Sequence, residues 1–174
     1  MGNSNRPYGF RAHGTLDGSS LSGSVRKYLV SDATAIFIGD LVTIGGTSGQ
    51  LYAGDPYYPT AIIAASGDVV LGVCVGIEPI ASNLNYNYRT AAVDMYIFVE
   101  TDPEMIYSIQ TDSVGAAVAD IGLNATVTVG AGSTATGRSS SVISGATLAA
   151  SAALDTLVVG YDPAPDNVPG AYAR

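Results

Sequence analysis

The 174-residue sequence predicts an all-β fold, a jelly-roll-like sandwich or barrel with an extended N-terminal arm. The composition favours strands over helices. Hydrophobic residues make up 47% of the chain and charged residues only 13%, whereas exposed helix faces are normally coated with Lys, Glu and Arg. The polar surface must instead come from Ser, Thr, Asn, Asp and Gly, which suit strands and turns. The high hydrophobic content also excludes a disordered chain.

The second indication is a succession of short apolar segments cut by Gly, Asp, Asn and Pro, without alternating strands and helices. Gly39-Asp40 lies between two β-branched segments, which predicts a hairpin. Residues 94–100 alternate between two faces, and residues 69–77 are apolar on both faces, as in the middle of a sheet or barrel wall. Only residues 113–120 favour a helix, of one or two turns. The expected strands are 28–30, 35–38, 41–44, 60–65, 69–77, 94–100, 105–110, 124–129 and 156–161.

Charge divides the chain unevenly. Residues 1–27 carry four basic residues against one acid, Asp17, whereas residues 28–174 carry three arginines against fourteen acids. We therefore expect a basic extended arm at 1–27, a β-barrel or sandwich body at 28–162 and an extended C-terminal tail at 163–174. An acidic body disfavours nucleic-acid binding because phosphates would be repelled. The arm is expected to become ordered only against a partner.

The side chains that dominate catalysis are nearly absent. Cys74 is the one cysteine, which excludes an intramolecular disulfide and a CxxC metal site. His13 is the one histidine, and it lies in the predicted arm, which would position a general base poorly. Residues 130–135 fit a GxGxxA pattern, but glycine and polar residues follow, so a hairpin loop is expected instead of a dinucleotide site. The sequence thus predicts no enzyme and no cofactor.

The sequence leaves a structural cation possible and disfavours a membrane span. Glu100, Asp102 and Glu104 alternate around a proline and leave open a structural cation on that loop. The longest apolar run, 69–77, is shorter than the ~18 residues of a membrane helix, so no membrane partner is expected.

Motifs spread over most of the chain carry a family resemblance. They are Gly2–Arg11, Thr34–Asp40, Leu71–Val73, Gly76–Pro79, Tyr88-Arg89, Asp102–Gln110, Val129–Ser133 and Thr136-Gly137. With these, the chain resembles the capsid cement (decoration) proteins of tailed bacteriophages, short-tailed phages in particular. The loops at 52–59 and 83–88 look particular to this chain, and the tail after Asp162 is shorter than the family pattern.

The resemblance implies a non-enzymatic protein on the outer surface of the head, assembled in the host cytoplasm. It would bridge neighbouring major capsid subunits, stabilise the shell against internal DNA pressure, and bind neither nucleic acid nor membrane. Its partners would be the major capsid protein and itself, as a dimer or a trimer, with the dimer slightly favoured. The expected capsid-contact residues of the arm are Arg6, Pro7, Tyr8, Phe10, Arg11, Arg26 and Lys27.

Two alternatives remain open at this point. A β-sandwich hydrolase could act on glycans through two carboxylates held in a cleft. A glycan-binding module of a virion could instead use tyrosines in loops, which cluster at Tyr57-Tyr58 and at Tyr86 and Tyr88.

Overall fold

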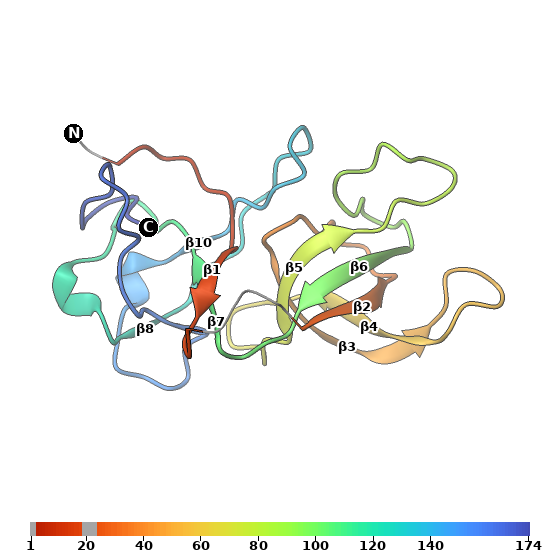
Figure 1. Cartoon of the computed structure of the whole chain (residues 1–174), viewed down its shortest axis with the longest axis horizontal. Helices are drawn as coiled ribbons and strands as arrows, with labels where there is room; N and C mark the ends of the chain where they lie inside the picture. The colour runs from red at the N-terminus through yellow and green to blue at the C-terminus, as the bar shows by residue number, and fades with distance from the viewer. Residues whose placement is uncertain (1–2, 19–23) are drawn as a thin grey trace.

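The chain forms two lobes side by side in the computed structural model, which describes residues 3–18 and 24–174 (Figure 1). Residues 24–101 form the barrel lobe. Residues 3–18 and 102–174 form the terminal lobe, which holds both ends of the described chain. The all-β prediction is confirmed, since the only helices among the described residues are two 3₁₀ helices of three residues each.

The barrel lobe is built on a closed five-stranded barrel, with the order β2-β4-β3-β5-β6. β2 and β4 run parallel, whereas the other neighbours are antiparallel. Closure leaves no free sheet edge, and five strands are fewer than the eight of a jelly roll. The strands are β2 (Val25–Val30), β3 (Leu41–Gly49), β4 (Tyr58–Ile63), β5 (Gly72–Ile77) and β6 (Met95–Glu100).

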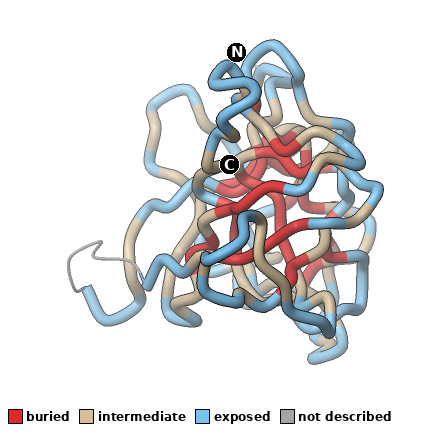
Figure 2. Tube along the Cα trace, turned by 90° about the vertical axis from the view of Figure 1, so that its right-hand side faces the viewer, coloured by how far each residue is buried: buried red, intermediate tan, exposed pale blue. Residues whose placement is uncertain are grey.

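Apolar side chains fill the barrel interior, and buried residues gather in the middle of the molecule (Figure 2). Met95, Ile97 and Val99, which share one face of the predicted strand, are fully buried, but Tyr96 on the other face is buried too, so burial does not alternate along the strand. Burying one such side chain stabilises a fold by about 1.5–3 kcal/mol. The interior cluster consists of Tyr28, Val30, Ile36, Val42, Ala61, Cys74, Ile97 and Val99.

The terminal lobe has short strands, so polar side chains fix much of its backbone. The carboxylate of Asp112 accepts hydrogen bonds from the backbone N–H groups of Val114, Gly115 and Gly145. Its elements are β1 (Arg11–Thr15) paired with β7 (Met105–Ser108), β8 (Asn124–Ala125) with β11 (Thr156–Leu157), β9 (Val127–Thr128) with β10 (Val142–Ile143), and the helices η1 (Val118–Asp120) and η2 (Gly145–Thr147).

The two lobes share a second hydrophobic core. Barrel residues Leu41, Ala64 and Val73 pack in one cluster with terminal-lobe residues, Phe10 and Ile143 among them. The buried carboxylate of Asp40 adds a polar link, because it accepts hydrogen bonds from the hydroxyls of Ser139 and Ser141 and from the N–H of Phe37. The terminal lobe therefore has no core that is independent of the barrel.

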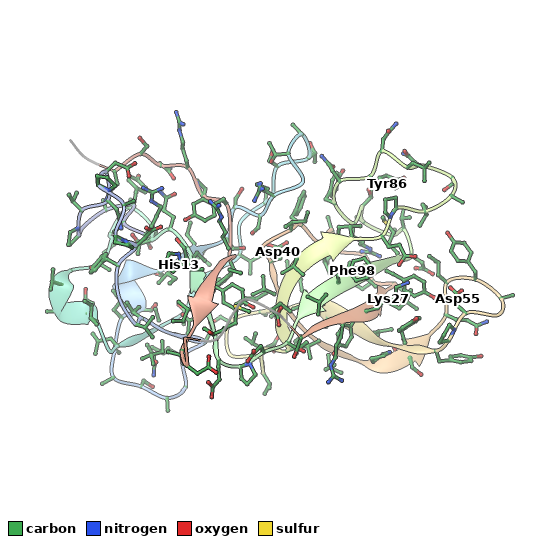
Figure 3. The ribbon with its side chains drawn as sticks, viewed as in Figure 1. His13, Lys27, Asp40, Asp55, Tyr86 and Phe98 are labelled. Carbon is green, nitrogen blue, oxygen red and sulfur yellow. The ribbon has the colours of Figure 1, made fainter. Side chains whose placement is uncertain are left out.

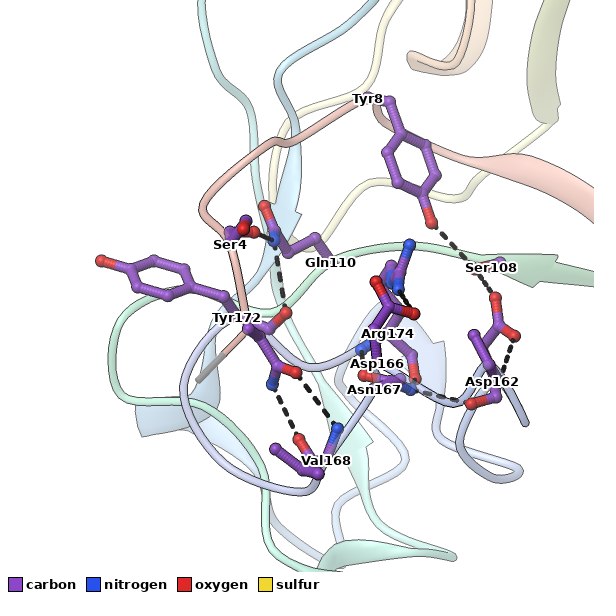
Figure 4. Close-up of polar contacts among 12 residues, drawn as sticks. Ser4, Tyr8, Ser108, Gln110, Asp162, Asp166, Asn167, Val168, Tyr172 and Arg174 are labelled. Atoms are coloured by element: carbon purple, nitrogen blue, oxygen red, sulfur yellow. Dashed lines mark hydrogen bonds and ion pairs between the residues drawn. The ribbon is translucent and has the colours of Figure 1, made fainter. Parts of the chain in front are cut away.

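Both ends of the described chain are clamped to the terminal lobe by Gln110 (Figure 4). The Gln110 amide nitrogen donates to the carbonyls of Ser4 and Tyr172 at 2.7 and 3.2 Å, and its oxygen accepts from the Arg6 N–H. Gln110 is only 2% exposed. The Asn3 side chain also bonds the backbone of Val168.

The prediction of an arm ordered only against a partner is therefore wrong for residues 3–18. β1 pairs with β7, and Phe10 is buried in the shared core. Val25 already begins barrel strand β2, so the expected boundary at residue 27 also falls inside a strand. The tail at 163–174 is extended but packs on the chain itself, with Ala173 fully buried. Residues 1–2 and 19–23 of the predicted arm lie outside the described residues.

Three local expectations were also wrong. Residues 35–38 form single bridges to Arg89 and Arg138 and no strand, so Gly39-Asp40 is a turn but not a hairpin. The helix expected at 113–120 is reduced to η1. Gly115 has a φ of +77° and lies against the Gly170 backbone, which breaks the helical path. The segment 124–129 is divided into β8 and β9.

Candidate functional site

A cleft of about 550 Å³ lies between the lobes. Its barrel side is formed by Leu41 and by residues 70–73, which lead into β5. Its terminal-lobe side is formed by Phe10, by residues 105–107 of β7 and by Leu157. The short link 101–104, which contains Pro103, joins the two sides between β6 and β7.

The rim of the cleft is apolar and faces water. Leu16, Leu157 and Val159 line it and are 62%, 57% and 48% exposed. A soluble domain normally leaves such side chains scattered, and a concave cluster of them marks a contact site. The site is therefore suited to bind an apolar group or segment.

A second cavity, of about 250 Å³, adjoins the cleft on the terminal lobe. His13, which Figure 3 places on β1, lies at its border, as do Thr111 and Tyr161. The buried hydroxyl of Tyr161 has no hydrogen-bond partner within the described part of the chain. The two cavities share the wall residues Ile106, Tyr107, Ile109, Ile143, Leu157 and Val159.

Acidic side chains lie at the cleft. Asp102 and Asp155 line it, and the exposed Glu104 follows closely on the same loop. Asp102 accepts the Glu104 N–H, and the two oxygens of Asp155 accept the N–H groups of Gly67 and Val127. Among the described residues, none of the three acids is ion-paired with Lys or Arg. The cleft thus combines an apolar wall with negative charge.

The electrostatics of Tyr107 reflect this environment. Burial raises the pKa of its phenol, and the nearby charges of Glu100 and Asp102 raise the pKa further. Glu100 is itself 4% exposed and accepts the Asp102 N–H. A positive group entering this end of the cleft would meet attractive charge from several carboxylates.

The residues at these cavities do not form a recognisable hydrolytic centre. Both oxygens of Asp155 are engaged by backbone N–H groups, as in a loop anchor. In the smaller cavity Ser108 bonds directly to Asp162 and to Tyr8, whereas a triad needs a histidine between serine and acid. The His13 side chain is exposed and has no hydrogen bond to the described residues. No group of three metal-ligating side chains occurs among residues 3–18 and 24–174, the loop at Glu100, Asp102 and Glu104 included.

The predicted arm contacts are dispersed by the fold. Arg6 and Arg11 are exposed on the terminal lobe, whereas Pro7 and Tyr8 are half-buried and Phe10 is buried. The Tyr8 hydroxyl is hydrogen-bonded to Ser108 at 2.9 Å (Figure 4). Only the two arginines of this segment are therefore free to contact a partner through their side chains without rearrangement.

The two basic residues of β2 lie on the barrel lobe. Arg26 is exposed, but Lys27 forms an ion pair with Glu78 and lies over the ring of Tyr96, 4.5 Å from its centroid. The hydrogen bond to Glu78 raises the pKa of Lys27. The Tyr96 hydroxyl in turn donates to Asp55 and so anchors the loop that follows β3. The Lys27 side chain is therefore engaged by residues of its own barrel lobe.

The tyrosine loops do not form one aromatic platform. Tyr58 packs edge-on against Tyr96, and Tyr88 stacks on Phe37 with ring centroids 4.7 Å apart. Tyr57 is 73% exposed. Half of the tyrosines expected to contact glycans are thus engaged in intramolecular packing.

Comparison with known proteins yields no relative. No family model, curated protein or solved structure matches the chain. Within the described residues, no helix has the length and hydrophobicity needed to cross a membrane. The interlobe cleft was not predicted from the sequence, because it depends on how residues 70–73 of the barrel lobe meet residues 105–107 and 155–159 of the terminal lobe. The one sequence feature that belongs to the cleft is the apolar triplet 157–159, which lies within the predicted strand 156–161.

Proposed function

We propose that this chain is a non-enzymatic cement protein that binds the outer surface of a phage head and bridges neighbouring major capsid subunits. The interlobe cleft carries the proposal, because a water-facing apolar rim is suited to protein contact. The shared core beneath the cleft supports it, since a rigid two-lobed body can transmit load between two neighbours. Binding only the intact shell would stabilise that shell by mass action.

Exposed arginines add a second means of contact. Arg6 and Arg11 project from the terminal lobe and Arg26 from the barrel lobe, on a chain whose net charge is −8. They would steer the protein toward acidic positions of the shell, and such contacts weaken with salt. Symmetric copies, a dimer or a trimer at a capsid axis, would add avidity to weak single contacts.

The direct test is decoration of emptied, purified heads with the recombinant protein. We expect electron microscopy to show symmetric copies on the outer surface, and decorated DNA-filled heads to release DNA at a higher temperature than undecorated ones. Deleting residues 2–11 is a poor test, because it removes Phe10 from the core. Arg6→Ala with Arg11→Ala leaves the core intact and should weaken decoration at low salt.

Two outcomes of the decoration experiment would contradict this function. A folded protein that leaves the heads bare, or that coats them without changing the temperature of DNA release, would not be a cement protein. The glycan-binding alternative would then be tested on a glycan array, with Tyr57→Ala as the variant that removes the most exposed loop tyrosine. Binding there but not to heads would favour that alternative.

A further inference from the structure

The terminal lobe leaves strand-like backbone unpaired beside the cleft. β11 pairs with β8, and residue 158 continues this pairing with Gly122 and Leu123. The backbone groups of Val159, Gly160 and Tyr161 then form no hydrogen bonds within the described residues. These residues border the smaller cavity, and Val159 also borders the cleft.

β7, on the same side of the cleft, offers a second strand with an unpaired edge. β7 pairs with β1 and with no other strand in the described parts of the chain. In an antiparallel pair, alternate residues direct their N–H and C=O groups away from the partner strand. Ile106 and Tyr107 of β7 form the wall that the two cavities share with Leu157 and Val159. An apolar groove therefore runs between two backbone edges.

Charge identifies the occupant more closely. The acids Asp102, Glu104 and Asp155 at the cleft have no ion-pair partner in the described chain. A second copy of this chain is disfavoured as the occupant, because each copy carries a net charge of −8. Its exposed arginines, Arg6, Arg11, Arg26 and Arg138, lie in segments whose backbone is already hydrogen-bonded within the chain.

We propose that the groove binds an extended segment of the capsid subunit, with alternating apolar side chains in the cleft and a Lys or Arg facing Asp102 and Glu104. The segment would add a strand to the backbone of residues 159–161, as in other cases of β-strand addition. The identity of the partner rests on the proposed function. The chemistry of the segment rests on the groove alone.

The probe is a seven-residue peptide that alternates Val and Thr and carries Lys at both ends. Its matched control carries Glu at both ends. Both are titrated into the isotopically labelled full chain, and amide chemical shifts are followed by NMR, which detects weak binding. We expect the Lys peptide to shift the amides of Ile106, Leu157 and Val159 and to slow hydrogen exchange at Gly160. The Glu peptide should bind at least about tenfold more weakly.

Two variants test the groove and its charge. Leu157→Arg places a charged, bulky side chain at the exposed rim and should weaken the Lys peptide about tenfold or more. Leu84→Arg is the matched control, since Leu84 is 74% exposed on a loop that does not border the groove. Asp102→Asn with Glu104→Gln should weaken binding about three- to tenfold, whereas Asp94→Asn, at an exposed acid that borders neither cavity, should not.

Equal binding of both peptides, no binding of either, or full binding to Leu157→Arg would overturn the proposal. So would a self-association that Leu157→Arg abolishes, since a second copy would then occupy the groove. The same variants are assayed on heads. If wild-type protein and Leu157→Arg decorate heads equally, the cement function stands and the groove proposal fails. If the Lys peptide binds but heads stay bare, the groove chemistry stands and the capsid assignment fails.

Discussion

The barrel lobe and the terminal lobe are stabilised by different interactions. Barrel strands of six to nine residues close on themselves around aliphatic side chains. In the terminal lobe, the four strands β8 to β11 have only two residues each. Side chains such as Gln110 and Asp112 hold the intervening loops through hydrogen bonds to their backbone. Apolar burial is cooperative over a whole core, whereas polar clamps can open one at a time. We therefore expect the terminal lobe to open locally at lower cost.

The largest effect is expected in the barrel interior. Ile97→Ala should lower the free energy of unfolding by about 2–5 kcal/mol, because it leaves a cavity among fully buried neighbours. Denaturant unfolding followed by circular dichroism measures this change. Since the lobes share a core, both should unfold in one transition.

The control for the barrel is Val75→Ala on β5. Val75 is 37% exposed on a barrel strand, so its truncation should cost much less than truncation of Ile97. Two separated transitions in Ile97→Ala would contradict the shared core. A terminal lobe that remained folded at that point would show that it has an independent core.

The next effect is expected at the terminal clamp. Gln110→Leu leaves the carbonyls of Ser4 and Tyr172 and the N–H of Arg6 without their partner, and should cost about 2–3 kcal/mol. Native-state hydrogen exchange should show faster exchange at Ala173, with the Ile97 amide changed only by the global destabilisation. Gln50→Leu, at a half-buried glutamine after β3, is the control. Unchanged exchange at Ala173 would show that the clamp does not hold the chain ends.

A smaller, pH-dependent effect is expected where the lobes meet. Burial raises the pKa of Asp40 above its ordinary value of 3.8, while hydrogen bonds from Ser139, Phe37 and Ser141 oppose the shift. The folded state therefore retains this proton to higher pH than the unfolded state. The contribution of Asp40 to stability is thus full below pH 3.8 and is lost as pH rises through its folded pKa.

Asp40→Asn removes this titration and leaves the other carboxylates in place. The stability of the wild type relative to Asp40→Asn should fall as the pH rises above 3.8, as measured by denaturant unfolding at several pH values. The loss of the acceptor for the Phe37 N–H adds only a constant offset. Asp166→Asn, at an exposed acid, should run parallel to the wild type. Parallel curves for Asp40→Asn as well would mean that Asp40 does not titrate differently on folding.

The contrast between lobes also explains what could be predicted from the sequence. Residues 94–100 show a two-residue period because one face meets a core, and the barrel strand was found there. Tertiary contacts override the local pattern elsewhere. Residues 35–38 have strand-forming side chains, yet they meet only single bridges from distant segments. The prediction for the arm was wrong because its charge suggested a free tail, whereas the burial of Phe10 depends on residues about thirty to a hundred and thirty positions away.

The candidate site was beyond sequence reasoning for the same reason. Leu16, Leu71 and Leu157 come together only because the lobes pack on each other, and no spacing along the chain encodes that. The sequence shows Asp102 as an acid beside a proline, but it does not indicate that Asp102 lies at an apolar cleft. The sequence shows the acidic and apolar side chains of the site, but it does not show that they line a concave surface.

The last prediction compares local opening of the two lobes by thiol labelling. Cys74 is fully buried in the barrel, and burial raises the pKa of its thiol to about 12, so a thiol reagent at pH 8 should react only when the barrel unfolds. Ala173→Cys, combined with Cys74→Ala, places a thiol at an equally buried position under the Gln110 clamp. If the terminal lobe opens locally, that thiol should react about tenfold faster or more, while Gly160→Cys in the same background reacts at once. Equal rates at positions 74 and 173 would mean that both lobes open only together, and the contrast between apolar core and polar clamps would then lie in sequence pattern alone.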